Sequence, residues 1–390
     1  MEELPLPSRT RVVFGENTVD GLGDLVRDLA AGAGRVLLVT DPGLVAIGHV
    51  ARAEAALRAA GLDVHRHDAV RQNPDTTDVD ACRDAITATN PDVLVGFGGG
   101  STIDAAKGAN FVFAGGGRME DYWGKNKAKG TLLPLVAVPT TAGTGTELQS
   151  FALIQQASTH QKMACGDPQA LPRLAVLDPT LTVTLPRDIT ACTALDTLGH
   201  AIETAVTRAR TDTSAPLSGE AFRLVHAHLP EVLADPGDLA SRGALLRAAA
   251  LGGCAIEHSM LGAAHAMANP LTAHRRIPHG HAVALALPHV IRFNAEDPAV
   301  ATIYAGLARD VDLASASTID RDAAHSLADR VGSLCDLAGL TRVLTAFDVE
   351  EADLDALATE AARQWTAQFN PRDVDAGTFR SLFRAALTPR

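Results

Sequence analysis

Four side chains in the second half of the sequence have the chemistry of metal ligands. Asp196 and His200 are four residues apart, so on a helix their side chains lie on one face, one turn apart. His265 and His279 follow in two short segments further along the chain. One carboxylate and three imidazoles that converge could bind a divalent transition metal and leave room for a substrate oxygen. The simpler alternative is a helix-surface pair, Asp196 with His200, and two unrelated histidines.

A glycine-rich segment in the first half, Gly96 to Lys107, follows a strand pattern and opens a helix pattern. Its glycines allow a tight turn and a close approach of the backbone to a pyrophosphate, and the helix start favours negative charge. The segment departs from GxGxxG because Ser101 stands at the sixth position. Asp104 lies in the first turn of this helix, either as a cofactor contact or simply as an N-terminal charge.

A second loop of small residues, Pro139 to Glu147, also follows a strand pattern. Its hydroxyl groups could bond to phosphate or adenine, although a structural loop has the same composition. Asp41, at the end of the first strand pattern, could accept hydrogen bonds from ribose hydroxyls and would repel a 2′-phosphate, which favours NAD over NADP. The alternative for Asp41 is a turn residue before Pro42.

The elements that must position these residues alternate, in the first half, between short β-branched runs and longer helical patterns. Strands separated by helices predict a parallel sheet covered on both faces, in a doubly wound nucleotide-binding arrangement. Strands are expected at 35–40, 62–66, 92–97 and 133–138, and helices at 45–60 and 78–89.

After Pro186 the sequence changes to long Ala- and Leu-rich helical patterns with few strand candidates. We therefore expect an α/β dinucleotide-binding domain at 1–186 and an all-α metal and substrate domain at 187–390. Within the second domain, helices are expected at 220–229, 239–253, 320–337 and 351–368, and an ordinary connection at 211–218.

The totals agree with a two-domain globular protein of 390 residues. A net charge of −12, without a basic stretch, argues against a nucleic-acid partner. The five scattered cysteines predict buried thiols in a reducing cytoplasm. The N-terminus has no signal-peptide pattern, and no run of about 18 apolar residues predicts a membrane span.

Taken together, these segments resemble the iron-containing (group III) alcohol dehydrogenase family, within the dehydroquinate synthase-like superfamily. The resemblance runs in the family's order over nearly the whole chain. It implies a dinucleotide-binding N-terminal domain, an all-helical C-terminal domain, and an active site in the cleft between them. The matching segments are Gly98–Ser101 with Asp104 and Lys107, Pro139–Glu147, Asp178–Thr182, Asp196–His200, His265–Ala268, Pro278–Gly280, Leu287–Pro288 and Asn370–Arg372.

Carried over residue by residue, the resemblance implies that Asp196, His200, His265 and His279 ligate the metal, which is Fe(II) or Zn(II). The cofactor is expected to be NAD, with NADP as the alternative, and the enzyme to be a cytoplasmic homodimer. The implied cofactor contacts are Asp41, Gly98, Gly99, Gly100, Ser101, Asp104, Thr140, Thr141, Thr144, Lys162 and Leu181.

Two departures from the family pattern concern the catalytic residues, which we expect to be His258, Asn269 and His279. The pattern often reads His-Ala-Met-Ala-His-Pro-Leu, and here its second histidine is Asn269, which cannot carry a proton at neutral pH. His258 stands where asparagine is common. We hypothesise that His258, His274 or His281 replaces the lost imidazole; the alternative is that all three are surface or helix-packing residues.

The implied activity is that of a metal-dependent alcohol dehydrogenase and aldehyde reductase. A divalent ion lowers the pKa of an alcohol and polarises an aldehyde carbonyl, while nicotinamide carries the hydride. The expected substrate is a small aliphatic alcohol or aldehyde, with or without a second polar group. The alternatives are another reaction on the same scaffold, such as oxoacid transhydrogenase or dehydroquinate synthase-like chemistry, and a non-catalytic nucleotide-binding protein.

Overall fold

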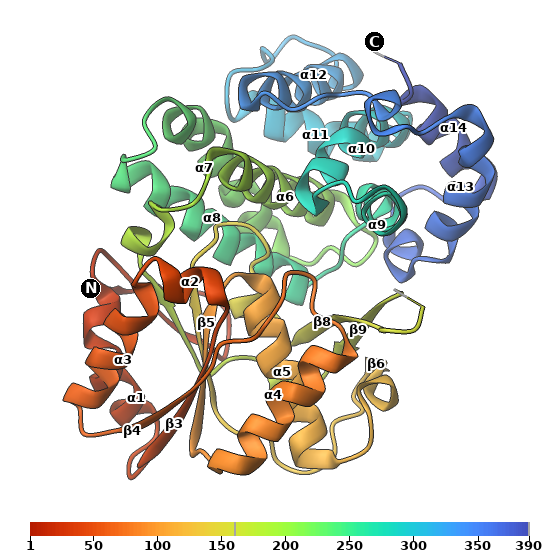
Figure 1. Ribbon diagram of the computed structural model, residues 1–390. Coiled ribbons are helices and arrows are strands. Elements are labelled where there is room, and N and C mark those ends of the chain that lie inside the picture. Colours follow the sequence, from red (N-terminus) through yellow and green to blue (C-terminus); the bar gives the residue numbers. More distant parts are fainter. Residues whose placement is uncertain (160, 389–390) are drawn as a thin grey trace. The chain divides into compact units, whose positions relative to one another are not determined.

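The computed structural model describes residues 1–159 and 161–388, and the chain divides into two compact units between Thr184 and Leu185. The boundary expected near Pro186 falls in the same short connection. The first unit has α/β layers and the second is helical (Figure 1). The predicted fold class is therefore confirmed.

A seven-stranded sheet forms the centre of the first unit, in the order β1-β2-β10-β7-β5-β3-β4. Strand β1 is antiparallel to β2, and the other neighbouring pairs are parallel. The carboxyl ends of the parallel strands therefore lie at one edge of the sheet. The strands are β1 (Glu2–Glu3), β2 (Arg11–Phe14), β3 (Arg35–Val39), β4 (Asp63–His67), β5 (Val93–Gly98), β7 (Leu135–Pro139) and β10 (Leu174–Leu177).

Helices cover both faces of this sheet (Figure 1): α1 (Leu22–Leu29), α2 (Pro42–Ala46), α3 (His49–Ala59), α4 (Thr76–Thr89) and α5 (Gly100–Gly115). Successive side chains of a strand point to opposite faces. On β3, Val36 and Leu38 share a core with residues of α1 and α3, whereas Leu37 and Val39 share a core with residues of α4 and α5. Burial on both faces explains why these strands are continuous apolar runs.

The expected strands are present as β3, β4, β5 and β7, but the single helix expected at 45–60 is wrong. It is replaced by α2 and α3. Asp41 caps α2 and Pro42 occupies its first position, which starts the helix early. Gly48, with φ 86°, then separates α2 from α3, because this left-handed conformation favours glycine and breaks a helix.

Three further strands form a second sheet in the order β6-β9-β8, with β6 at Gly124–Lys125, β8 at Phe151–Gln155 and β9 at Lys162–Gly166. Lys107 connects helix α5 with the segment that leads into β8. The Lys107 side chain is 1% exposed, and its ammonium donates to the carbonyl oxygens of Thr146, Gln149 and Phe151 at 2.7, 2.7 and 3.0 Å.

Asp104, one turn before Lys107, supplies the neighbouring negative charge. Its carboxylate accepts hydrogen bonds from Thr146 Oγ1 at 2.6 Å and from the Leu153 amide at 3.2 Å. Burial raises the pKa of Asp104, while Lys107 and these hydrogen bonds act in the opposite direction. Helix α5 is therefore joined to the following loop and strand by a buried network of opposite charges.

The second unit is arranged about α6 (Arg187–Val206), which is buried over most of its length. Helix α6 packs against α7 (Ser214–Ala234), α8 (Leu239–Glu257) and α10 (His279–Asn294). The remaining helices are α9 (Ala263–Arg275), α11 (Pro298–Arg309), α12 (Asp320–Ala338), α13 (Leu354–Arg363) and α14 (Ala376–Ala385).

The helices expected at 220–229, 239–253 and 320–337 lie within α7, α8 and α12. The connection expected at 211–218 is wrong in part, because α7 already begins at Ser214. There the hydroxyls of Thr211 and Ser214 each accept from the other's backbone amide, at 3.0 Å, which stabilises a helix start. The helix expected at 351–368 is shorter, since only α13 is α-helical and 3₁₀ turns flank it.

Helix α8 is long and apolar enough to cross a membrane by length and composition, which differs from the expectation that no run of the sequence has these properties. Its apolar window has a mean hydropathy of 1.2, and 83% of that window is buried inside the structure. Burial of this extent is the environment of a core helix.

We expect Lys107→Met to lower the free energy of unfolding by about 3–5 kcal/mol, because it leaves the buried Asp104 carboxylate without its neighbouring cation. Urea unfolding followed by circular dichroism measures the change. Lys129→Met, at an exposed position, is the control and should stay within about 0.5 kcal/mol of the wild type. Equal unfolding free energies for the wild type and Lys107→Met would contradict the stabilising role of this network.

Candidate active site

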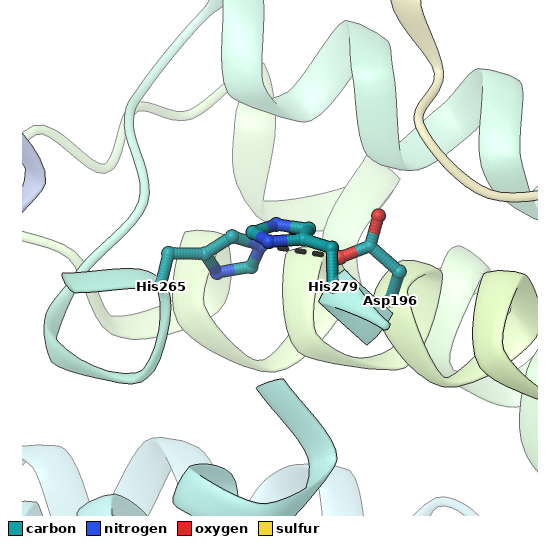
Figure 2. Close-up of side chains that lie close together, drawn as sticks. All are labelled: Asp196, His265 and His279. Atoms are coloured by element: carbon teal, nitrogen blue, oxygen red, sulfur yellow. Dashed lines mark ion pairs between the residues drawn. The ribbon is translucent and has the colours of Figure 1, made fainter. Parts of the chain in front are cut away.

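Three helices of the second unit bring the four predicted ligands to one place. Asp196 and His200 lie one turn apart on α6, His265 lies in the first turn of α9, and His279 is the first residue of α10. The Nε2 atoms of His200, His265 and His279 lie 3.6, 3.4 and 3.7 Å from Asp196 Oδ1. Figure 2 shows the rings of His265 and His279 directed toward the Asp196 carboxylate.

These donor atoms form a compact group. One ligand atom from each of Asp196, His265 and His279 lies within 4.8 Å of the other two. The His200 ring stacks on that of His265 with ring centres 5.0 Å apart, so His200 adjoins the same group. The side chains of Asp196, His200 and His265 are at most 7% exposed, and they are therefore not a helix-surface pair with an unrelated neighbour.

Glycines allow α6 and α10 to approach closely enough for this convergence. A Cβ atom on Gly280 would lie 1.8 Å from the Cys192 carbonyl oxygen, and one on Gly199 would lie 2.4 Å from Val283 Cγ1. Gly280 directly follows His279, so the contact of Gly280 with α6 fixes the position of His279 relative to Asp196.

The charges in the group stabilise one another. Burial opposes ionisation of Asp196, but the imidazoles of His200, His279 and His265 outweigh it and hold the pKa of Asp196 well below its usual range. Burial likewise opposes the charged form of His265, yet its contacts with Asp196 and Glu203 raise the pKa of His265 to about 9. A negative charge on Asp196 and a positive charge beside it are thus the favoured state.

The donor chemistry fits a divalent transition metal. Asp196 Oδ1 and His265 Nε2 are buried and, apart from the ion pairs just described, make no hydrogen bond with the part of the chain that the structure describes. Buried polar atoms of this kind are costly unless a cation or a hydrogen bond satisfies them. Imidazole nitrogens and a carboxylate oxygen are ligands that both Zn(II) and Fe(II) accept.

Two of the histidines considered as replacements for the lost imidazole lie outside the group. His274 pairs with Glu360, with 2.6 Å between Nε2 and Oε2, and its side chain is 55% exposed. His281 Nε2 lies 2.8 Å from the Thr341 carbonyl oxygen, and its ring meets Phe347 edge-on. These contacts agree with the alternative that His274 and His281 are surface and packing residues, and a catalytic role for either stays a prediction.

The expected catalytic residues His258 and Asn269 lie at two different helix positions. His258 is the C-cap of α8, and its carbonyl accepts from Thr211 Oγ1 at 3.1 Å. Asn269 lies one turn after His265 on α9, and its side-chain amide donates to Gln364 Oε1 at 2.9 Å. Their catalytic roles stay predictions.

The residues expected to contact the cofactor lie mostly at the carboxyl edge of the seven-stranded sheet. The chain runs from β3 outward to β4 and then returns to β5 on the other side of β3. Ligands of doubly wound sheets bind where the strand order changes direction in this way. Asp41 follows β3 and Gly98 ends β5, so the two residues flank this position.

The glycine-rich turn packs tightly against the second loop. Gly99 is the N-cap of α5, and Gly100 is its first residue. A Cβ atom on Gly100 would lie 2.6 Å from Thr144 Cγ2, and the Thr140 amide donates to the Gly98 carbonyl at 3.0 Å. The two loops therefore form one rigid surface of backbone and hydroxyl groups next to a helix N-terminus, which suits a pyrophosphate.

Several of the polar side chains expected here also have local partners. Asp41 Oδ1 accepts from the Leu44 amide at 3.1 Å, and Ser101 Oγ accepts from the Asn73 amide at 3.1 Å. Thr141 lies against Gly99, since a Cβ atom there would be 3.3 Å from Thr141 Cγ2. A direct contact of each with the cofactor stays a prediction.

The last three expected contacts differ in burial. Lys162 begins β9 and is one of the charges that act against the raised pKa of Asp104. Asp104 itself is 7% exposed and bonded inside the unit. Leu181 is fully buried in the core, so its contact with the cofactor stays a prediction.

Glu203 is a further residue of the site that was not expected from the sequence. It is 3% exposed, and its Oε2 atom lies 2.6 Å from His265 Nδ1. A signal was present, because Asp196, His200 and Glu203 are spaced i, i+4, i+7 and therefore share one face of α6. Glu203 contacts the ligand group from this same face.

Comparison with known families covers almost the whole chain. The family described as iron-containing alcohol dehydrogenase matches residues 9–179, and the C-terminal part of the Fe-containing alcohol dehydrogenase family matches residues 190–387. The chain belongs to the iron-containing alcohol dehydrogenase family. It is therefore an oxidoreductase of the iron type, and the resemblance seen in the sequence is confirmed.

Individual relatives agree with this family. The chain is 33% identical to alcohol dehydrogenase 4 of Schizosaccharomyces pombe over 92% of this chain and 83% of that protein. It is 32% identical to the NAD-dependent methanol dehydrogenase of Bacillus methanolicus, over 96% and 97% respectively. A solved structure of 1,3-propanediol oxidoreductase matches with a TM-score of 0.93 and 30% identity, covering 99% of this chain and 100% of that one.

We expect Gly280→Ala to lower the free energy of unfolding by about 1–3 kcal/mol, because the added methyl group forces α10 away from the Cys192 carbonyl. The same shift moves His279 and should weaken Zn(II) binding. Thermal unfolding and competition with a chromophoric chelator measure the two effects. Gly306→Ala in α11 is the control, since a Cβ atom there meets nothing within 4 Å. Wild-type zinc affinity in Gly280→Ala would contradict this account.

Metal binding should depend on pH, because a proton and a metal ion compete for His265 Nε2. With the pKa of His265 raised to about 9, the metal-free ring is mostly protonated at neutral pH. The apparent affinity for Zn(II) should therefore rise by up to about tenfold per pH unit below pH 9 and level off above it. Chelator competition across this range measures the slope. An affinity independent of pH between about 6 and 8.5 would contradict the expectation.

Proposed function

We propose that the chain is a metal-dependent NAD(P) alcohol dehydrogenase and aldehyde reductase acting on small aliphatic alcohols, including those with a second polar group. The observation that carries the proposal is the convergence of three imidazoles on the buried Asp196 carboxylate, in a chain of this family. The names of its relatives, a methanol dehydrogenase and a 1,3-propanediol oxidoreductase, support a small alcohol as substrate.

Asp196, His200, His265 and His279 would hold the metal. A bound divalent ion supplies an electrophile that stabilises negative charge on the substrate oxygen in either direction of the reaction. Asp196 contributes the compensating negative charge, and the burial of three of these side chains keeps water from competing for the donor atoms. The donor set accommodates Fe(II) and Zn(II), and the family's name favours Fe(II).

We propose NAD as the preferred cofactor, with NADP as the alternative. Asp41 follows β3 at the point where the ribose of a dinucleotide binds in doubly wound sheets. Its carboxylate can accept hydrogen bonds from ribose hydroxyls and repels a 2′-phosphate. The name of the NAD-dependent relative supports the same preference.

A second polar group on the substrate would find neutral partners near His265. Asn269 and Gln364 form a side-chain amide pair at 2.9 Å, and Asn269 lies on the same face of α9 as His265, one turn away. An amide pair donates and accepts hydrogen bonds without a charge, which suits a hydroxyl better than an acid.

A cytoplasmic location and a homodimeric state are also proposed. The five cysteines are free and buried, which supports a reducing compartment. Gel filtration with light scattering measures the oligomeric state, and a monomer would contradict the proposed dimer.

The function is tested with protein stripped by a chelator and then loaded with Fe(II) without oxygen, or with Zn(II). Formation of NADH from methanol, 1-propanol and 1,3-propanediol is followed by absorbance, and NADP replaces NAD in a parallel series. We expect loading to restore activity by about 10²-fold or more, because the metal supplies several kcal/mol of charge stabilisation. Loaded protein that reduces no NAD with any alcohol would contradict the proposal and favour a transhydrogenase or a synthase-like reaction.

A further inference from the structure

Helix α9, which carries His265, begins without a capping side chain of its own, because its N-cap residue is Gly262. The first N–H groups of a helix have no acceptor within the helix. Two side chains from distant segments supply acceptors here. Glu203 of α6 accepts from the amides of Gly262 at 3.0 Å and Ala264 at 2.6 Å, and Asn370 accepts from Ala263 at 3.4 Å.

Glu203 also contacts the imidazole of His265. Its Oε2 atom lies 2.6 Å from His265 Nδ1, and both side chains are 4% exposed. A carboxylate can only accept hydrogen bonds, so Nδ1 must carry a proton. In the neutral ring the lone pair is then on Nε2, the atom 3.4 Å from Asp196 Oδ1.

Helix α6 therefore contacts the His265 ring at both of its nitrogen atoms. Asp196 faces Nε2 and Glu203 faces Nδ1. The two carboxylates are seven residues apart on α6, which corresponds to about two turns and 10.5 Å along a helix. Because one buried helix carries both, their separation is fixed, and so is the rotation of the ring between them.

We propose that Glu203 is a positioning residue that fixes the tautomer and the orientation of His265, so that Nε2 is the atom available to the metal. The inference rests on the metal-binding role proposed for His265. A carboxylate at Nδ1 also makes the ring a stronger ligand. The amide groups and the N-terminal dipole of α9 stabilise the charge of Glu203 in its buried position.

A purely structural Glu203 would do no more than cap α9, and Asn370 provides the comparison for that role. Asn370 accepts from the same helix turn, and it exchanges two side-chain hydrogen bonds with Asn294, at 3.0 and 2.8 Å. Its hydrogen bonds thus stabilise the start of α9 without the proton on His265 Nδ1 being involved. Loss of Asn370 and loss of Glu203 should therefore have different consequences.

The decisive variant is Glu203→Gln, which keeps the size of the side chain and removes its charge. In either orientation the new NH₂ group faces a backbone amide that Glu203 now accepts from, and in one of them it also donates to Nδ1 and places the ring proton on Nε2. We expect the affinity for Zn(II) and Co(II), measured by competition with a chromophoric chelator, to fall about 10- to 100-fold. The visible spectrum of bound Co(II) should change as well.

Two control variants separate positioning from capping. Asn370→Ala should lower the melting temperature of the metal-free protein with a much smaller loss of affinity. Glu360→Gln makes the same change in an exposed carboxylate–histidine pair, that of Glu360 with His274. It should change neither the melting temperature nor the metal affinity. Wild-type metal affinity in Glu203→Gln, or an equal loss in Asn370→Ala, overturns the proposal.

Nitrogen-15 NMR of the histidine rings, recorded at a pH high enough for the His265 ring to be neutral, gives a second readout. In the wild type and in Glu203→Asp we expect His265 to keep its proton on Nδ1, so the aspartate variant decides the matter if Glu203→Gln does not fold. A ring proton on Nε2 in Glu203→Asp overturns the proposal. A wild type that binds neither ion contradicts the proposed function instead, and the Nδ1 proton signal of the metal-free protein then decides the role of Glu203.

Discussion

The buried carboxylate of Asp196 is the constraint on which the second unit depends. An isolated charge at this depth is strongly unfavourable, and Asp196 is tolerated because three imidazoles lie within 4 Å of its Oδ1 atom. Those rings come from three helices, so the charge can be compensated only if α6, α9 and α10 are all in place. The charge of Asp196 is therefore compensated only in the state in which these three helices are packed together. Glycines meet it sterically, since Gly199 and Gly280 let the helix backbones approach where any side chain would collide.

In the first unit, too, a residue without a side chain permits a close approach of two segments. Its glycine-rich turn and the following threonine-rich loop touch because Gly100 lacks a Cβ atom beside Thr144. Behind this surface, the oppositely charged side chains of Lys107 and Asp104 connect the loop to α5 through buried hydrogen bonds. Under the proposed function, the backbone groups that would bind a dinucleotide are thus fixed before it arrives, which would lower the entropy lost on binding. In both units, small residues permit the close approach, and buried polar groups set its geometry.

Much of this arrangement is visible in the sequence, because it follows from local rules. The strands β3, β5 and β7 appear as apolar runs, and the spacing of Asp196 and His200 places them on one helix face. What escapes prediction depends on contacts between distant segments. Strands β2 and β10 are short, and they form by pairing with each other and with β1 and β7. The roles of Lys107 and Glu203 become clear only when residues 39 to 62 positions away are brought beside them. The sequence shows a glycine at position 48, but it does not show that this glycine adopts the left-handed conformation that separates α2 from α3.

The four ligand candidates are not equally exposed to solvent. The side chains of Asp196, His200 and His265 are 7%, 5% and 4% exposed, whereas that of His279 is 25% exposed. His265 is held between two carboxylates of α6, and His200 belongs to α6 itself, so these rings have little freedom. His279 is instead the first residue of α10, and the position of that helix depends on the contact of Gly280 with Cys192. Among these four side chains, that of His279 is therefore the one that solvent reaches most readily. Under the proposed function, a substrate oxygen would approach from the side of His279, where the group is open to solvent, while the three buried side chains keep their places.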